Sequence, residues 1–256
     1  MTRKVFLPVL LLVSMALTAC GGGGGGSDSG AYAPAEPPPA PQDAGQIVSS
    51  TLRATQNGFT YNIQTYLPAS YASGSTALPV IYATEGDAPY GVGGRSRFDV
   101  FREAMQSRGT QAILVGISGT ARRNVDFLLP GATQYIDFIA KDLAPATERQ
   151  YRADPRRRAL SGLSHGGYLV VAALVLEGAA GHLSLSHYLS TESSVGGHAS
   201  LDAYLAFERQ LDGSGNPAPA TLFLAGARNG NGPVIVNPLY AQMSGHAHPG
   251  LTLLKV

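Results

Sequence analysis

The sequence predicts an α/β protein in which helices cover both faces of a mostly parallel sheet. Three observations predict this class. From residue 59 onward, strand-like and helix-like segments alternate, as they do when crossover helices connect parallel strands. Residues 112–117 are apolar throughout, which is typical of a strand buried on both faces. Residues 169–176 are also apolar all round, which suits a central buried helix.

Seven strands are expected, each rich in apolar, β-branched or aromatic residues, at residues 59–67, 79–84, 112–117, 157–160, 183–189, 221–225 and 251–256. Helical spacing of apolar residues predicts helices at residues 97–106, 169–176, 201–210 and 238–243. One further helix is expected to carry Tyr135, Phe138, Ile139 and Leu143 and to end at Pro145.

Composition excludes several classes of protein. The chain has 256 residues, of which 44% are hydrophobic and 14% charged, so it is not a disordered charged tail. With 18 Lys and Arg against 17 Asp and Glu, the net charge of +1 offers no bulk positive field for nucleic acid. The single cysteine excludes an internal disulfide framework and a multi-cysteine zinc site. Stability must therefore come from an ordinary buried core.

The amino terminus predicts export. Residues 1–19 have a short basic start, an apolar run and small residues before Cys20, which is the pattern of a signal peptide and is short for a membrane span. The ending L-T-A-C resembles the lipobox of bacterial lipoproteins. This resemblance implies a lipid anchor at Cys20 on a bacterial membrane, facing the periplasm or the cell surface. A plain secretory signal with an incidental cysteine is the alternative.

A tether and one folded domain are expected after the signal. Residues 20–46 are rich in Gly and Pro and have almost nothing to bury, so we expect a solvated linker. The folded domain is expected to span residues 47–256, a length that suits a single α/β domain.

The most specific motif is G-L-S-H-G at residues 162–166, which fits G-x-S-x-G between a strand-like segment and a buried helix. In this setting the serine occupies a tight turn that exposes its hydroxyl above the sheet, and the flanking glycines leave room for that turn. Gly167 lets the helix pack close to the sheet, and the helix dipole favours the alkoxide formed during attack. Ser164 is therefore the predicted nucleophile. The alternative is an idle serine in a Gly-rich turn.

Further segments occur in order around this motif. They are Y-L-P at residues 66–68, V-I-Y leading to E-G-D within residues 80–87, Arg122-Arg123 with Asp126-Phe127, and the segment at residues 138–158. Together they resemble the putative-esterase family of bacterial α/β-hydrolases, which includes esterase D-like, enterochelin-esterase-like and feruloyl-esterase-like enzymes. The resemblance covers residues 50–180 well and implies an α/β-hydrolase fold.

The resemblance implies an oxyanion hole made of two backbone amides. One is that of His165, directly after the nucleophile, and the other is that of Asp87, directly after the Glu-Gly turn. The Asp87 carboxylate is expected to point away, because a carboxylate beside an oxyanion is unfavourable. For Asp87 the alternative is an exposed turn residue with no catalytic part.

The rest of the catalytic triad departs from the family pattern. This fold places the acid after the seventh strand and the histidine after the last one. However, no Asp or Glu follows Asp212, and the last predicted strand reaches Val256. We therefore expect the domain to lack a carboxyl-terminal segment that carries the catalytic histidine. His198, in the loop after the sixth strand, is an outside candidate.

Glu192, in the same loop as His198, is the candidate acid, and a solvated loop residue is its alternative reading. Asn229 or Asn231 could orient the histidine instead, although an amide supplies no negative charge to stabilise an imidazolium.

Two other histidines are expected to lie far from the nucleophile. His246 and His248 precede the last strand, so they belong to the sheet edge opposite Ser164, and a six-residue strand spans about 20 Å. Their H-A-H spacing suggests a metal, but no third ligand is apparent, so no metal site is predicted. No G-K-[ST] phosphate-binding motif occurs, and no cofactor is predicted.

The leading function is a serine hydrolase that cleaves a small carboxylic ester through an acyl-enzyme on Ser164. Acyl transfer to another alcohol is one alternative. A non-catalytic binding lipoprotein that kept the fold and lost the triad is the other, because the acid and the histidine are not evident. The membrane, reached through Cys20, is the second expected partner, and nucleic acid is not expected.

Overall fold

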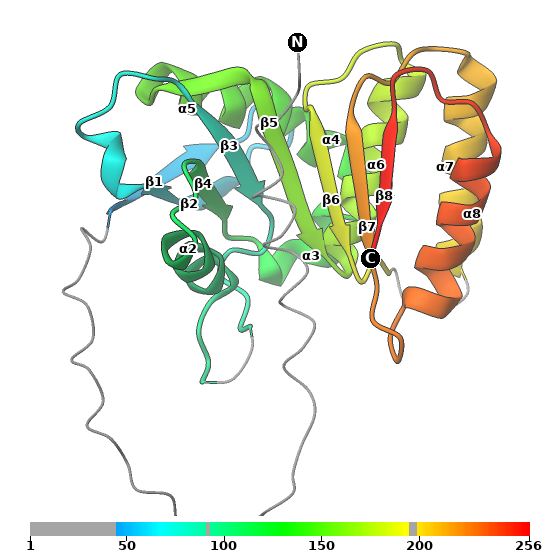
Figure 1. Cartoon of the computed structure of the whole chain (residues 1–256), viewed down its shortest axis with the longest axis horizontal. Coiled ribbons are helices and arrows are strands. Elements are labelled where there is room, and N and C mark those ends of the chain that lie inside the picture. Colours follow the sequence, from blue (N-terminus) through cyan, green and yellow to red (C-terminus); the bar gives the residue numbers. More distant parts are fainter. Residues whose placement is uncertain (1–44, 91–92, 195–198) are drawn as a thin grey trace, which may run out of the picture.

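Eight strands form one sheet in the computed structural model, which describes residues 45–90, 93–194 and 199–256 (Figure 1). Their order across the sheet is β1-β2-β4-β3-β5-β6-β7-β8. The strands are β1 (Gln46–Arg53), β2 (Thr60–Leu67), β3 (Leu78–Ala83), β4 (Ile113–Ile117), β5 (Ala153–Leu163), β6 (His187–Thr191), β7 (Thr221–Ala225) and β8 (Thr252–Lys255). All seven strands predicted from the sequence are present.

The sheet is mostly parallel, as predicted. Neighbouring strands run parallel from β4 through β3, β5, β6 and β7 to β8, whereas β2 is antiparallel to both β1 and β4. The parallel strands all end at one edge of the sheet. Residues that directly follow those ends are therefore brought together, although they are far apart in the sequence.

Strand β1 was not predicted. Most of its residues are exposed, so it lacks the alternation of buried and exposed positions that identifies a half-buried strand. Its conformation is held by pairing along its whole length, from Gln46 opposite Leu67 to Arg53 opposite Thr60. A long-range partner, rather than a local pattern, thus makes this segment a strand.

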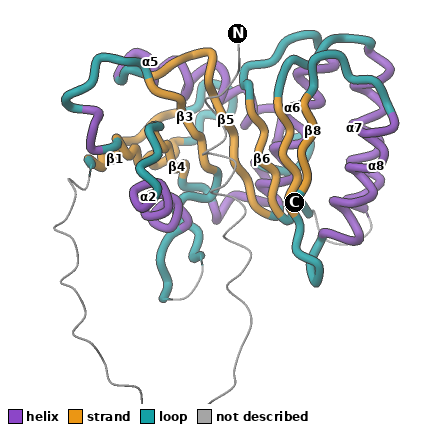
Figure 2. The backbone as a smooth tube through the Cα atoms, viewed as in Figure 1, coloured by secondary structure: helices purple, strands orange, loops and turns teal. Residues whose placement is uncertain are grey.

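Helices cover the sheet on both faces and enclose two apolar cores. The helices are α2 (Arg97–Ser107), α3 (Arg123–Asp126), α4 (Gly131–Asp137), α5 (Ala144–Gln150), α6 (His165–Ala179), α7 (Ala199–Ser214) and α8 (Asn237–Gly245). Phe98 and Met105 of α2 pack on one face, and the apolar residues of α4 to α8 pack in the larger core on the other. Figure 2 shows α2 apart from the other helices. No helix in the described residues is long and apolar enough to span a membrane.

The helix predicted to end at Pro145 continues instead to Gln150. A π-helical turn at Phe138–Leu143 links α4 to α5, and Pro145 occupies the first turn of α5. The backbone stays helical through Leu143 and Ala144, and the π-helical turn before Pro145 changes the hydrogen-bond pattern that its missing N–H would otherwise interrupt. The prediction was wrong because it treated the proline as an interior breaker.

Strand β6 begins at His187 rather than at residue 183. The residues before it are held in a loop by Glu177, whose carboxylate accepts hydrogen bonds from the backbone N–H of Ser184 at 3.1 Å and from its hydroxyl at 2.6 Å. A side chain on α6 therefore delays the start of this strand.

Candidate active site

Ser164 stands on a strained turn between β5 and α6. Its backbone angles, φ 57° and ψ −114°, lie outside the regions that a serine ordinarily adopts. A Cβ on Gly162 would lie 1.9 Å from the carbonyl oxygen of Gly166, and a Cβ on Gly166 would lie 2.5 Å from Oγ1 of Thr84. The backbone N–H of Ser164 donates to the carbonyl of Thr191, at the end of β6, at 3.0 Å. The turn therefore needs both glycines, as the motif predicted.

Backbone strain is concentrated at this edge of the sheet. Among the described residues, three non-glycine residues have positive φ: Glu85 at 54°, Ser164 at 57° and Glu192 at 47°. They follow closely the carboxyl ends of β3, β5 and β6, respectively. Strained conformations of this kind persist only where surrounding contacts enforce them, and they cluster at functional sites.

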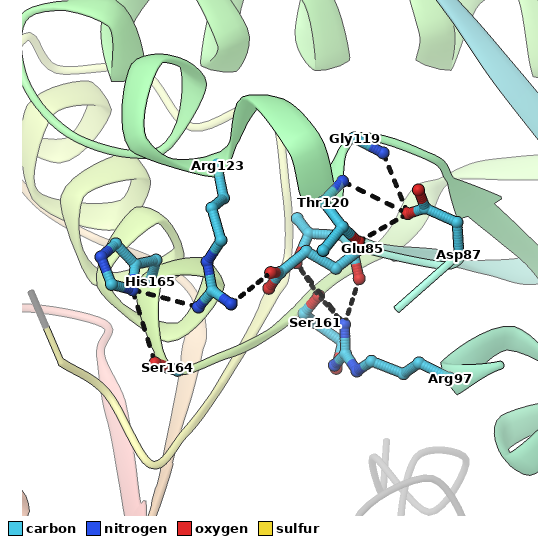
Figure 3. Close-up of polar contacts among 10 residues, drawn as sticks. Glu85, Asp87, Arg97, Gly119, Thr120, Arg123, Ser161, Ser164 and His165 are labelled. Atoms are coloured by element: carbon cyan, nitrogen blue, oxygen red, sulfur yellow. Dashed lines mark hydrogen bonds and ion pairs between the residues drawn. The ribbon is translucent and has the colours of Figure 1, made fainter. Parts of the chain in front are cut away.

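Both predicted oxyanion donors are backbone N–H groups without a hydrogen-bond acceptor among the described residues. Within the described chain, neither the N–H of His165 nor that of Asp87 donates a hydrogen bond to another protein group. The Asp87 carboxylate faces the loop after β4, where Oδ1 accepts hydrogen bonds from the N–H of Gly119 at 3.0 Å and from the hydroxyl of Thr120 at 2.8 Å (Figure 3). This is the orientation expected of a carboxylate that must avoid an oxyanion.

A chain of charged and polar groups joins the Glu-Gly turn to the nucleophile turn (Figure 3). Glu85 is buried, with 4% of its side chain exposed, and its Oε1 lies 3.2 Å from Nη1 of Arg123. The other terminal nitrogen of Arg123 lies 3.0 Å from Nδ1 of His165. Burial raises the pKa of Glu85, and the guanidinium of Arg123 opposes that shift. The sequence indicated Arg123 only as part of a family-like segment, because its partners lie 38 and 42 residues away.

Arg97 also binds to this region, through hydrogen bonds to the ends of two strands. It is buried, and it donates to the hydroxyl of Ser161 at 2.9 Å and to the carbonyl of Thr84. Burial lowers its pKa to about 10, and the nearby charge of Glu85 opposes the shift. The guanidinium of Arg97 thus links the carboxyl ends of β3 and β5, close in sequence to Ser164.

The imidazole of His165 is poorly suited to act as the general base. Its Nδ1 lies 3.5 Å from Oγ of Ser164, beyond the usual reach for proton transfer. Because a guanidinium has only donors, Nδ1 accepts from Arg123 and its lone pair is engaged. Burial, and then the charge of Arg123, lower the pKa of His165.

Glu192 anchors the loop that follows β7. Its carboxylate accepts hydrogen bonds from the backbone N–H of Asn231 at 2.8 Å and from that of Ala227. The side-chain amide of Asn231 in turn donates to the carbonyl of Glu192 at 3.1 Å. The candidate acid therefore lies at the correct edge of the sheet, held by a loop in which the family normally carries its acid.

The remaining candidates are not brought to Ser164 by the described structure. His198 and Cys20 lie outside the described residues. His246 and His248 precede β8 and contact Glu208 of α7, so they occupy the opposite edge, as predicted. In the described part of the chain, no histidine has a ring nitrogen within 3.2 Å of Oγ of Ser164.

A serine with a strained backbone, in a turn flanked by glycines at the end of a strand of a mostly parallel sheet, defines the class of α/β-hydrolases. The family model described as putative esterase matches residues 55–180, which include the Glu-Gly turn, Arg123 and the nucleophile turn. Through these residues the chain resembles the putative esterase family, and the predicted resemblance is confirmed. No curated protein matches the chain.

Several solved structures share the fold. An IroE-like serine hydrolase from Shewanella oneidensis has a TM-score of 0.68 and 23% identity, over 82% of this chain and 73% of that one. The BES protein from Bacillus cereus has a TM-score of 0.65 and 19% identity, over 88% and 90%. The siderophore hydrolase EstA from Aspergillus nidulans has a TM-score of 0.65 and 18% identity, over 89% and 91%.

Proposed function

We propose that the protein hydrolyses carboxylic esters through an acyl-enzyme on Ser164. The observation that carries this proposal is the strained backbone of Ser164 between β5 and α6. This conformation costs free energy in folding and has no evident structural benefit, whereas it exposes a nucleophile at the start of a helix. The match to the esterase family supports ester hydrolysis as the general reaction.

The proposed reaction begins when Oγ of Ser164 attacks the ester carbonyl and its proton passes to a histidine. The carbonyl oxygen becomes an oxyanion, which accepts hydrogen bonds from the N–H groups of His165 and Asp87. Each such donor contributes about 3–4 kcal/mol to transition-state stabilisation. The histidine then protonates the leaving alcohol, and an acyl-enzyme remains. Water attacks the acyl group by the same route and releases the carboxylic acid and free Ser164.

The histidine is proposed to come from His198 or from residues that follow Val256. Val256 directly follows β8, at the edge of the sheet where Ser164 lies, and His198 comes after β6 in the sequence. The carbonyl of Val256 lies 3.4 Å from the N–H of Gly226, in the loop that Glu192 holds. Glu192, with Asn231 beside it, is the proposed group that orients this histidine.

The proposed substrate is a small ester reached in the exported, lipid-anchored form, with Cys20 as the acylated residue. One of the solved relatives is named a siderophore hydrolase, so siderophore esters belong in the substrate panel beside short-chain nitrophenyl esters. The anchor is tested by the mass of the mature chain, which should begin at an acylated Cys20.

The experiment is fluorophosphonate labelling of the purified chain, combined with hydrolysis of the ester panel. The Ser164→Ala variant should lose the phosphonyl adduct and reduce kcat by on the order of 10³-fold or more. The matched control is Ser107→Ala, because that exposed serine on α2 donates its hydroxyl to the carbonyl of Ala104 in its own helix. His198→Asn and Glu192→Gln, compared in the same assay, assign the base and the orienting acid.

Equal labelling of wild type and Ser164→Ala would remove Ser164 as the nucleophile. If His198→Asn keeps full activity, His198 is not the base. Release of acyl product only when an alcohol is added would indicate the transferase alternative. A folded chain that binds esters but neither labels nor turns over would indicate the binding lipoprotein.

A further inference from the structure

A second polar cluster lies at the sheet edge opposite Ser164. His246 and His248 belong to the segment between α8 and β8, and Glu208 projects from α7. Helices α7 and α8 lie side by side at the end of the sheet that carries β8 (Figure 1). The cluster therefore joins α7 to the segment between α8 and β8, and the proposed ester chemistry does not use it.

The three side chains converge on one point. Oε1 of Glu208 lies 3.0 Å from Nε2 of His248 and also contacts Nδ1 of His246. All three potential ligand atoms lie within 4.8 Å of one another. The two imidazole rings are nearly perpendicular, at 78°, with centroids 6.3 Å apart. The residue between them, together with the extended backbone of His246, directs both rings to the same side.

The burial of Glu208 calls for a positive partner. Its side chain is fully buried, and a buried carboxylate is strongly unfavourable unless it is paired. The other oxygen, Oε2, accepts a hydrogen bond from the neutral amide of Gln242, which also donates to the carbonyl of Leu205 at 3.2 Å. Within the described residues, the ion-pair partners of Glu208 are only the two histidines, and neutral imidazoles carry no charge.

We propose that Glu208, His246 and His248 bind a zinc ion. Two imidazoles and one carboxylate are a ligand set that zinc adopts, with bonds of about 2.0–2.2 Å. Such bonds place tetrahedral ligand atoms about 3.3 Å apart, so small side-chain shifts suffice here. Imidazole nitrogen disfavours calcium and magnesium, which prefer oxygen ligands.

The surroundings fit a site with one open position. His248 is buried, with 4% of its side chain exposed, whereas His246 is 39% exposed. Water can therefore reach the ion from the side of His246 and complete the coordination. Gln242 orients the carboxylate by holding Oε2, which leaves Oε1 for the metal, as outer hydrogen bonds do at many metal sites. The bound ion would cross-link α7 to the segment that leads into β8.

The test is zinc binding by the full chain, purified without a polyhistidine tag and stripped with a chelator. After equilibrium dialysis against Zn²⁺, the metal content is measured by mass spectrometry, and thermal unfolding is followed with and without zinc. The variants are His246→Asn, at the exposed ligand, and Glu208→Gln. The matched control is His182→Asn, because His182 is an exposed histidine outside the cluster.

Wild type and His182→Asn should retain about one zinc per chain and unfold at a higher temperature with zinc. Both cluster variants should lose at least ten-fold in zinc affinity and the zinc-dependent rise in Tm. If Glu208→Gln does not fold, His246→Asn decides, because the exposed asparagine leaves the buried contacts of Glu208 with His248 and Gln242. Zinc bound equally by wild type and His246→Asn, or no zinc bound by wild type, would overturn the proposal.

Discussion

The two edges of the parallel sheet carry polar clusters of different kinds. At the carboxyl edge, Glu85, Ser164 and Glu192 all have positive φ, and all three are held by groups from other segments. At the opposite edge, His246 has ordinary extended angles, φ −110° and ψ 155°, and the cluster is made by side chains alone. Strain therefore accompanies the proposed nucleophile, whereas the proposed metal site needs none.

This difference follows from what each site must hold. A nucleophile must be exposed in one orientation against a helix N-terminus, and only a forced backbone turn achieves this. A metal ion instead organises its own ligands, so flexible side chains need only be within reach of it. Substitutions that restrict the backbone should consequently act much more strongly at the first edge than at the second.

The largest contrast is expected from glycine substitutions. In Gly162→Ala the new Cβ would lie 1.9 Å from the carbonyl oxygen of Gly166, so the backbone of the nucleophile turn must change its conformation. We expect a loss of about 4 kcal/mol or more in the free energy of unfolding, or no folded protein. The control is Gly213→Ala, in α7, where a Cβ would meet nothing within 4 Å and a gain of up to about 1 kcal/mol is expected. Urea unfolding measures both, and equal effects would contradict the contrast.

The next effect is expected from the ion pairs. Arg123→Gln leaves the buried carboxylate of Glu85 without its closest cation and should lower the free energy of unfolding by about 2 kcal/mol. The matched control is Arg156→Gln, because Arg156 is 88% exposed and pairs with Asp154 at the opposite edge of the sheet. That change should cost less than about 1 kcal/mol. A smaller effect for Arg123→Gln than for Arg156→Gln would remove the structural role of Arg123.

The smallest effect concerns pH. Burial and Arg123 lower the pKa of His165 in the folded protein below the ordinary value of 6.5. The unfolded chain then binds the proton more readily, so the stability from neutral His165 is present above the unfolded pKa and is lost as pH falls. Because the ring is partly solvated, we expect a difference below about 1 kcal/mol. Urea unfolding between pH 7 and 5 should show a weaker acid dependence for His165→Asn than for wild type and for the control His182→Asn.

The sequence by itself determined the elements whose signals are local. The alternation of strands and helices predicted the mostly parallel sheet, and G-x-S-x-G placed Ser164 at the end of β5. These signals are readable because burial on both faces, strand-to-helix turns and close backbone contacts each require particular residue types within a few positions. The strand that lacked such a signal, β1, was missed for the same reason.

Only the tertiary structure decided which distant residues meet. Arg123 lies 38 residues from Glu85 and 42 from His165, and Glu208 lies 38 and 40 residues from its two histidines. No local pattern encodes these contacts, because they depend on how strand order and helix packing bring separate segments together. The H-A-H triplet alone therefore predicted no metal site, because no third ligand was apparent in the sequence. The proposed zinc site emerged only from the fold, in which α7 places the fully buried carboxylate of Glu208 against both imidazoles.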